Sequence, residues 1–531
     1  MERMRALRAT ICSLMFVVAG CVVLGGCPSQ REYANDVGLS RQAAYRQWET
    51  RKTREEGQQP RISGKLSVGD CVKLTLAHNK MLQQTMEERN VAEGQLVSSR
   101  SAYLPNVSVS AAYQRKELVP AFDIPGPGGT TQHVELGTLD NYSAALTVTQ
   151  PLYAGGAISA QVRAARLFSL LADQTVRAAT QDVVYATETA YYNLLLSQHL
   201  VDISTDAVRA SKVHLDDVEK KHDGGVASDF DVLRAQVELS NFEADLIRSK
   251  NAINIARANL IKTMGISQDS DFVLSDEFAY APIQVSMEHA VETAFTNRPD
   301  LYSREYQIRQ QREQLKIARS RYLPNASAYF TNSWSSPSPT NFGSSSSEWG
   351  RIWQAGVQGA LPIFDGFQRE GNIIQQKARL KQAQIGLVDA EETAVFELTQ
   401  AILSMENAEE FVQSQRLNLT RATEGLRLAQ VGYEQGVNTQ VEVIDAQSAL
   451  TTARVNYYQA IYSHVVARLA VQRAMGTIVN AQTASAPQTE KTDGGPKAEE
   501  RGPKMQAGGQ KSDGSPSSPP PANEAKPEEK R

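Results

Sequence analysis

The sequence predicts a mixed α/β membrane protein built as two repeats, each combining a long α-helical hairpin with a pair of short β-strands. Three observations predict this class. The phrase "YLPN" occurs twice, at Tyr103 and at Tyr322. Residues 157–223 contain neither glycine nor proline and place apolar residues three and four positions apart, which is typical of coiled-coil helices. Short runs beside each "YLPN" alternate apolar and small polar residues, which is typical of strands.

The two repeats keep a nearly constant offset. Pro105 and Pro324 are 219 positions apart, whereas Pro151 and Pro362 are 211 apart, so the second repeat is about eight residues shorter between its prolines. A repeat of this length fixes the architecture, and two copies predict a pseudo-symmetric protomer rather than a solenoid. We expect a first repeat over residues 65–265, a linker over 266–284 and a second repeat over 285–476.

The N-terminus has the pattern of an export signal. Arginines precede an apolar run that is too short to span a bilayer, and small residues follow it. "LGGC", ending at Cys27, looks like a bacterial lipobox, so we expect a signal peptide over residues 1–26 and a lipidated tether over 27–64. Cys21 in "VAGC" is a second candidate for the lipid, and an ordinary signal peptide without lipid is the alternative to both.

Composition excludes several classes of protein. The net charge of −4 gives no basis for nucleic-acid binding, and a mean hydropathy of −0.38 excludes a bundle of membrane helices. No metalloprotease motif, phosphate-binding loop or zinc cluster occurs, so we expect no catalytic site, metal or cofactor. Residues 477–531 are rich in Pro, Gly, Ser and charge, which predicts a disordered tail.

The long helices pair as hairpins. Residues 157–223 are followed by a second helical stretch over 226–264, and residues 372–431 by one over 437–475. The predicted turns are "DGGVAS" (223–228) and "EQGVNT" (434–439).

Four alternating runs follow the helix-ending "LPN" and the loops beyond it: "VSVSAAY", "YSAALTVTQ", "NASAYFTN" and "WQAGVQGAL". Each run is close to the length that a tilted membrane strand needs, although a soluble sandwich face would show the same alternation. We expect flexible loops between the strands of each pair. Four strands cannot close a barrel in lipid, so other copies of the chain must complete it; counting alone allows eight, twelve or sixteen strands.

At this point the chain resembles the outer membrane efflux (TolC-like) family over residues 66–476. The resemblance is carried by "YLPN", "QPLYAGG/LPIFDG", "GGVASDFDVLRAQ/QGVNTQVEVIDAQ" and the terminal "MG", in order and twice. It implies a homotrimer in the outer membrane of a Gram-negative bacterium. Three chains would form a twelve-stranded β-barrel there, and an α-helical barrel would cross the periplasm to an adaptor and an inner-membrane pump.

The resemblance also assigns roles at the helical turns. Glu442 and Asp445, three apart on one helix face, would form a carboxylate ring at a closed periplasmic entrance; the alternative is an ordinary solvated face. Asp231 is the expected partner of an arginine that the family often carries two positions after the tip glycine, but this chain has Asn438 there.

Gly225 and Gly436 are predicted to permit the tight turns. Val226 and Val437 are candidates for adaptor contact, with packing inside the hairpin as the alternative.

The function that the resemblance implies is an exit duct of a tripartite efflux or type I secretion system, opened by contact with its partners. A periplasmic coiled-coil scaffold or adhesin without a pore is the alternative, because it needs the same helices but not the strands.

Overall fold

The computed structural model describes one of two units into which the chain divides. The units are residues 1–484 and 485–531. Cys21, Cys27, the signal peptide and almost all of the C-terminal tail lie outside the described residues. Those residues are 30–56, 62–119, 121–125, 127–129, 131–135, 138–278, 280, 282, 285–339 and 348–479.

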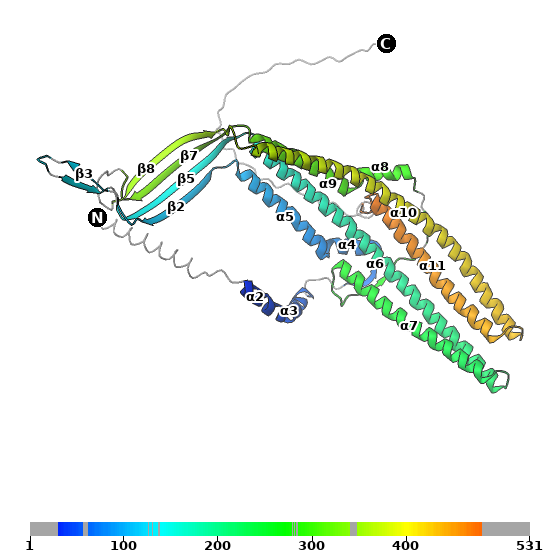
Figure 1. The fold of residues 1–531 in the computed structure, drawn as a ribbon. Coiled ribbons are helices and arrows are strands. Elements are labelled where there is room, and N and C mark those ends of the chain that lie inside the picture. The colour runs from blue at the N-terminus through cyan, green and yellow to red at the C-terminus, as the bar shows by residue number, and fades with distance from the viewer. Residues whose placement is uncertain are drawn as a thin grey trace, which may run out of the picture. The chain divides into compact units, whose positions relative to one another are not determined.

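A four-stranded antiparallel sheet joins the two repeats (Figure 1). The first repeat supplies β2 (Asn106–Arg115) and β5 (Asp140–Ala154), and the second supplies β7 (Asn325–Ser336) and β8 (Gly350–Ala360). The order is β2-β5-β7-β8, so the repeats meet between β5 and β7. The predicted strands are confirmed. Among the described strands, β2 and β8 each pair on one side only.

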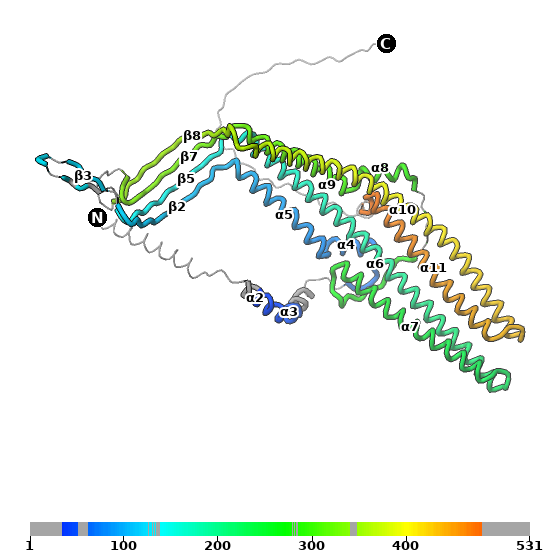
Figure 2. Tube along the Cα trace, in the orientation of Figure 1, coloured from blue at the N-terminus to red at the C-terminus, as the bar shows by residue number. Residues whose placement is uncertain are grey.

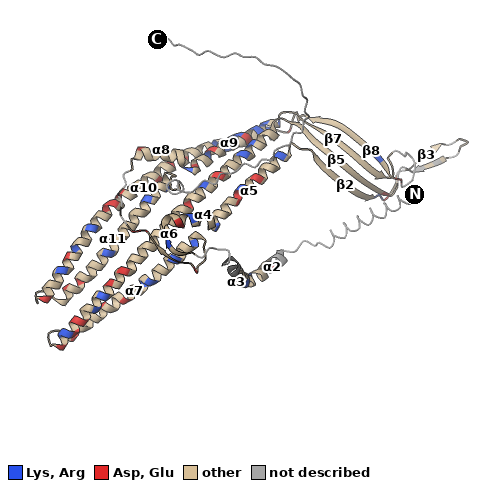
Figure 3. Cartoon of the chain, turned by 180° about the vertical axis from the view of Figure 1, so that it is seen from behind, with Lys and Arg blue, Asp and Glu red and all other residues tan. Residues whose placement is uncertain are grey.

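The pairing register gives the sheet one apolar and one polar face. Val109 pairs with Leu146 and Val107 pairs with Val148, which in turn pairs with Phe330. The intervening row is polar and consists of Ser108, Thr147, Thr331 and Gln354. Because strand side chains alternate between faces, the apolar halves of all four strands lie mainly on one side. The strands carry few charged residues, in contrast with the helices (Figure 3).

Two hairpins of very long helices follow the sheet (Figure 2). The first pairs α6 (Ala157–Asp223) with α7 (Asp229–Met264), and the second pairs α10 (Gln368–Glu434) with α11 (Gln440–Ala474). α6 and α10 each have 67 residues, so each is about 100 Å long. Among the described helices, none combines the length and apolarity that a membrane crossing requires.

Shorter helices complete the helical layer beside the sheet. α5 (Lys80–Ser101) packs on α6, and α9 (Pro299–Ser320) packs on both α6 and α10. The order is therefore α5, α6, α9, α10. Each "LPN" marks a helix-to-strand crossing, as predicted: its proline follows the end of α5 or α9, and its asparagine begins the strand.

A compact core lies midway along α6, at the C-terminal end of α7. Here α4 (Val68–His78) and a parallel pair of short strands, β1 (Ser63–Leu66) and β6 (Asp271–Leu274), pack on α6 and α7. The buried Tyr191 hydroxyl donates to the Leu66 carbonyl at 3.2 Å and accepts from the Asp276 N–H at 3.3 Å. Tyr191 is therefore a packing residue whose polar atom has partners.

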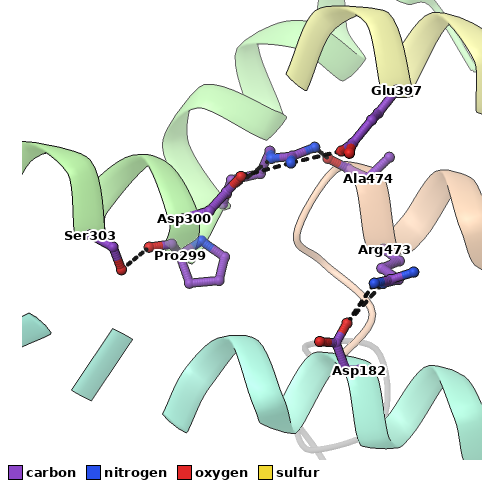
Figure 4. Close-up of polar contacts among 8 residues, drawn as sticks. Asp182, Pro299, Asp300, Ser303, Glu397, Arg473 and Ala474 are labelled. Atoms are coloured by element: carbon purple, nitrogen blue, oxygen red, sulfur yellow. Dashed lines mark hydrogen bonds and ion pairs between the residues drawn. The ribbon is translucent and has the colours of Figure 1, made fainter. Parts of the chain in front are cut away.

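A polar joint attaches the second hairpin at the same level (Figure 4). Arg473 at the end of α11 binds Asp182 on α6 at 2.7 Å. Arg298, which precedes α9 and follows α8 (Met287–Asn297), binds both Asp300 and Glu397 at 2.8 Å. The Arg298 guanidinium has little exposure, so these two carboxylates compensate for a charge that would otherwise be costly to bury.

The structure adds helices to the tether, and it corrects the expectation that the first loop between strands is flexible. The tether contains helices α2 (Gln30–Gln42) and α3 (Ala44–Glu56), because its Ala, Gln, Glu and Arg residues favour helix even without a core. The first loop contains a hairpin of β3 (Ala121–Pro125) and β4 (Thr131–Glu135), since alternating residues flank its glycine-rich turn.

Gly265 generates a prediction about stability. It ends α7 with φ +72°, and a Cβ there would overlap the His78 carbonyl. Gly436 has the same φ with nothing within 4 Å. We expect Gly265→Ala to lower the free energy of unfolding by about 2–4 kcal/mol, against about 1 kcal/mol for Gly436→Ala, because only the first adds a clash to the backbone strain. Thermal unfolding followed by circular dichroism measures both, and equal shifts would contradict the clash.

Candidate functional site

The two hairpin turns have the same backbone design. Gly225 and Gly436 adopt φ of 75° and 72°. After each glycine, the next N–H closes the helix end: Val226 donates to the Lys221 carbonyl and Val437 to the Gly432 carbonyl, both at 2.8 Å. A left-handed residue followed by this hydrogen bond is a common helix terminus, and glycine adopts it without steric cost.

The valines after these glycines are fully presented to solvent. Val226 is 82% exposed and Val437 is 80% exposed. They therefore do not pack inside their hairpins, which was the alternative reading. Two isolated apolar side chains at the ends of long helices form a surface that a partner could cover.

Two of the three predicted gate carboxylates cap their own helices. At the start of α7, Ser228 donates through its hydroxyl to the Asp231 carboxylate at 2.7 Å, and the Asp231 N–H donates back at 3.2 Å. At the start of α11, the Thr439 N–H donates to the Glu442 carboxylate at 2.7 Å. Both are complete capping boxes. The stretches "SDFD" and "TQVE" follow the capping-box pattern, which is a signal for these contacts in the sequence itself.

Capping fixes the charge of Asp231. Hydrogen bonds from the backbone N–H of Ser228, and then from its hydroxyl, hold the pKa of Asp231 below its ordinary value. The resulting stabilisation is present above the ordinary aspartate pKa of about 3.9 and is lost as the pH falls through the lowered value. Asp231 is therefore ionised at neutral pH.

Asp445 differs from the capping carboxylates. It is exposed on α11, one turn beyond Glu442, and makes no hydrogen bond or ion pair with the residues that the structure describes. Glu442 is also exposed. Both carboxylates are therefore exposed within one turn of α11, and only Glu442 is engaged in capping.

Gln440 joins the two tips and was not singled out from the sequence. Its amide donates to the Asp231 backbone carbonyl at 3.0 Å, so the start of α11 is tied to the start of α7. The side chain is only 6% exposed, and its own carbonyl has no partner among the described residues. No local pattern marks a contact between residues 209 positions apart.

Asn438 folds back onto its own hairpin. Its side chain lies over Gly432, where a Cβ would come within 2.5 Å of the amide nitrogen. Lys221 instead bridges the hairpins, with its ammonium 3.7 Å from the centre of the Tyr433 ring. Within one chain, Gln440 and Lys221 therefore contact the other hairpin near the tips, whereas Asn438 lies against its own hairpin.

Comparisons with known proteins agree with this architecture. The family model described as outer membrane efflux protein matches residues 71–266 and 290–477. The outer membrane protein TolC of Vibrio cholerae is 22% identical over 76% of this chain and 88% of its own length, and OprJ of Pseudomonas aeruginosa is 22% identical over 76% and 83%. The CmeC outer membrane channel of Campylobacter jejuni superposes with a TM-score of 0.64 at 18% identity, over 77% of this chain and 85% of its own.

The capping boxes generate a prediction about the tips. Ser228→Ala should cost about 1 kcal/mol locally, which increases transient opening of the first tip about fivefold. We expect trypsin to cleave after Lys220 or Lys221 correspondingly faster under conditions in which opening limits exposure of the bond.

The control is Ser448→Ala, which alters an exposed serine inside α11. Equal cleavage rates in the two variants would show that the box does not hold the tip closed.

Proposed function

Because the chain belongs to the outer membrane efflux protein family, we propose that three copies form one continuous channel, with a twelve-stranded barrel in the outer membrane and a helical barrel in the periplasm. The protein is an outer membrane efflux channel. The observation that carries the trimer is the four-stranded sheet with an apolar face and two edges that no described strand completes.

In hydrocarbon, each unpaired backbone N–H or C=O costs several kcal/mol, because no water can replace the missing partner. The edge of β8 in one copy can pair with the edge of β2 in the next. Three such junctions would leave no edge, and the apolar rows of the strands would then face lipid.

The helices would close in the same order. Several large apolar side chains remain exposed on α7 and α10 in a single chain, such as Ile247 at 70% and Phe396 at 66%. Neighbouring copies would cover surfaces of this kind. The two hairpins of each copy would then line a duct whose tips meet the periplasmic adaptor, with Val226 and Val437 as contact residues, and an inner-membrane pump would drive cargo into it.

The entrance would be lined by carboxylates. Three copies place Glu442 and Asp445 around one axis as six acidic groups, which create a strong local field for cations. Asp231 belongs to the adjacent helix start and supports this entrance through its backbone contact with Gln440. Opening would separate the tips when the adaptor binds.

A periplasmic scaffold without a pore is disfavoured. It would share the helices, but it would not need four strands whose register gathers apolar residues on one face. Conduction requires no chemistry in the wall, and we propose no catalytic role for the chain.

The lipid anchor is a separate proposal that rests on the sequence around Cys27. Cys27→Ser should abolish incorporation of labelled palmitate, whereas Cys21→Ser should leave it intact. Label retained after Cys27→Ser and lost after Cys21→Ser would move the anchor to Cys21.

The pore and its gate are tested together in planar bilayers. The purified protein should migrate as a heat-modifiable trimer and conduct ions. Glu442→Ala with Asp445→Ala should raise conductance and weaken block by divalent cations about tenfold, because the paired carboxylates are gone.

Two further variants separate charge from capping. Glu442→Gln with Asp445→Asn removes the charge and keeps an acceptor for the Thr439 N–H, so it should also weaken the block. Glu406→Gln with Glu410→Gln removes two exposed carboxylates within α10 and should change nothing. Unchanged divalent block in the tip variants would remove these residues from the gate, and a monomer without conductance would contradict the channel.

A further inference from the structure

A strongly basic groove lies between α6 and α9, close to the sheet. Five cationic side chains and one carboxylate line a cavity of about 490 Å³, together with Leu167. The charged residues are Arg163, Arg166, Arg309, Arg312, Lys316 and Glu313. This excess of positive charge occurs in a chain whose net charge is −4.

The charges of the groove are only partly compensated. Glu313 binds Lys316 at 2.6 Å and Arg163 at 2.9 Å. Burial opposes its charged form, yet these two cations hold the pKa of Glu313 below its ordinary value. Arg166 and Arg312 make no ion pair with the described residues, and both are exposed. Two guanidinium groups are thus available to an anion, and guanidinium suits the oxygen atoms of phosphate.

The groove is not a requirement of the fold, because the other repeat lacks it. At the repeat offset of 211, Arg163 and Arg166 correspond to Ile374 and Lys377. At the offset of 219, the counterparts of Arg309, Arg312 and Lys316 are Asn90, Glu93 and Val97. Ile374 and Val97 are exposed apolar residues at 67% and 60%, and Lys377 is the one cation among the five counterparts, so the cluster of positive charge is not repeated.

The height of the groove places it near the membrane. Lys316 lies four residues before the end of α9, and Arg166 lies nine residues after the start of α6. At 1.5 Å per residue, the five cations lie roughly 6 to 17 Å from the helix-to-strand crossings. If the strands span the hydrocarbon, this is the level of the inner-leaflet headgroups and the adjoining periplasm.

The handedness of the sheet decides which way the groove faces. The Lys116 N–H donates to the Leu139 carbonyl, so alternate residues of β2, including Ser108 on the polar face, direct their N–H groups toward β5. If the apolar face is turned toward lipid, the chirality of L-residues fixes the direction in which the strands follow one another around the barrel. Viewed along the barrel axis, from the strands toward the helices, the order β2, β5, β7, β8 then runs clockwise.

The right-handed winding of α6 then fixes the outer surface of the helical layer. On α6, Asp173 binds Arg89 of α5, while Arg163 binds Glu313 of α9. These two contacts show which side of α6 faces α5 and which side faces α9. Arg163 and Arg166 occupy the face that points away from the channel axis. The cations therefore face the surroundings of the channel rather than its bore.

We propose that this groove binds the phosphate headgroup of an anionic phospholipid in the inner leaflet of the outer membrane, one groove per copy. The inference rests on the proposed barrel, which supplies the membrane level and the outward face. Basic pockets at the membrane surface of helical proteins bind anionic lipids by the same chemistry. The bound lipids would hold the channel at a fixed depth and rotation.

The test uses the purified full-length trimer in detergent with phosphatidylglycerol, phosphatidylethanolamine or inorganic phosphate as the probe. Native mass spectrometry counts bound lipids and gives their dissociation constants. Arg166→Gln with Arg312→Gln should weaken phosphatidylglycerol binding roughly 10- to 30-fold, which is the strength expected for two cations at an anionic surface. Phosphatidylethanolamine should bind more weakly than phosphatidylglycerol.

The matched control is Lys377→Gln with Lys381→Gln, which removes two exposed cations from the corresponding face of α10. It should leave phosphatidylglycerol binding unchanged. Equal weakening in both variants, or none in either, would overturn the inference. Competition by millimolar inorganic phosphate to the same extent as by lipid would assign the groove to free phosphate instead.

Two results separate this inference from the channel itself. Suppose that the trimer conducts ions but binds phosphatidylglycerol equally well as the wild-type protein and as the Arg166→Gln with Arg312→Gln variant. This result contradicts only the lipid site. Failure of the wild-type protein to form a trimer contradicts the channel and the lipid site together.

Discussion

The constraint that organises the molecule is the unsatisfied edge of its sheet. β2 and β8 each lack a partner on one side among the described strands, and the face between them is apolar. A sheet with unpaired edges is unstable in lipid, and in water it tends to pair with the edges of other sheets. In the proposed trimer, other copies of the chain would pair these edges. The adjacent order of α5, α6, α9 and α10 and the apolar surface left on single helices suit the same assembly. Within one copy, the pairing of β5 with β7 joins the two repeats into one sheet. The two free edges, β2 and β8, therefore come from different repeats of the same chain.

At the tips, a side chain of the proposed gate also has a structural role. Glu442 accepts the Thr439 N–H and is at the same time an exposed carboxylate. Its removal therefore alters both helix nucleation and the local field, which is why charge-neutral and truncated variants are needed side by side. Asp445 carries no capping duty and reports the field alone. The contact from Gln440 to the Asp231 carbonyl is a single hydrogen bond, so breaking it costs little free energy.

The sequence was most informative where periodicity was long. The 67 residues of α6 coincide with the glycine- and proline-free stretch, and the four alternating runs became strands in the expected pairs. It was less informative where structure depends on contacts distant in sequence. Gln440 could not be found because its partner lies 209 positions away, and β1 pairs with β6 across more than 200 residues. The β3–β4 hairpin and the helices α2 and α3 were missed for a different reason, because the loop-like or polar composition of these segments concealed their local preference for strand and helix.

The equal lengths of α6 and α10 have a consequence for how such a chain can change. The second repeat is shorter by about eight residues between its prolines, yet both helices contain 67 residues, so the whole difference falls in the strands and their connections. A residue gained or lost inside one long helix would rotate everything below it by about 100° and shift its turn along the axis. Insertions and deletions are therefore tolerable in the loops between the strands. They are not tolerable within α6 or α10, unless both helices change in length together.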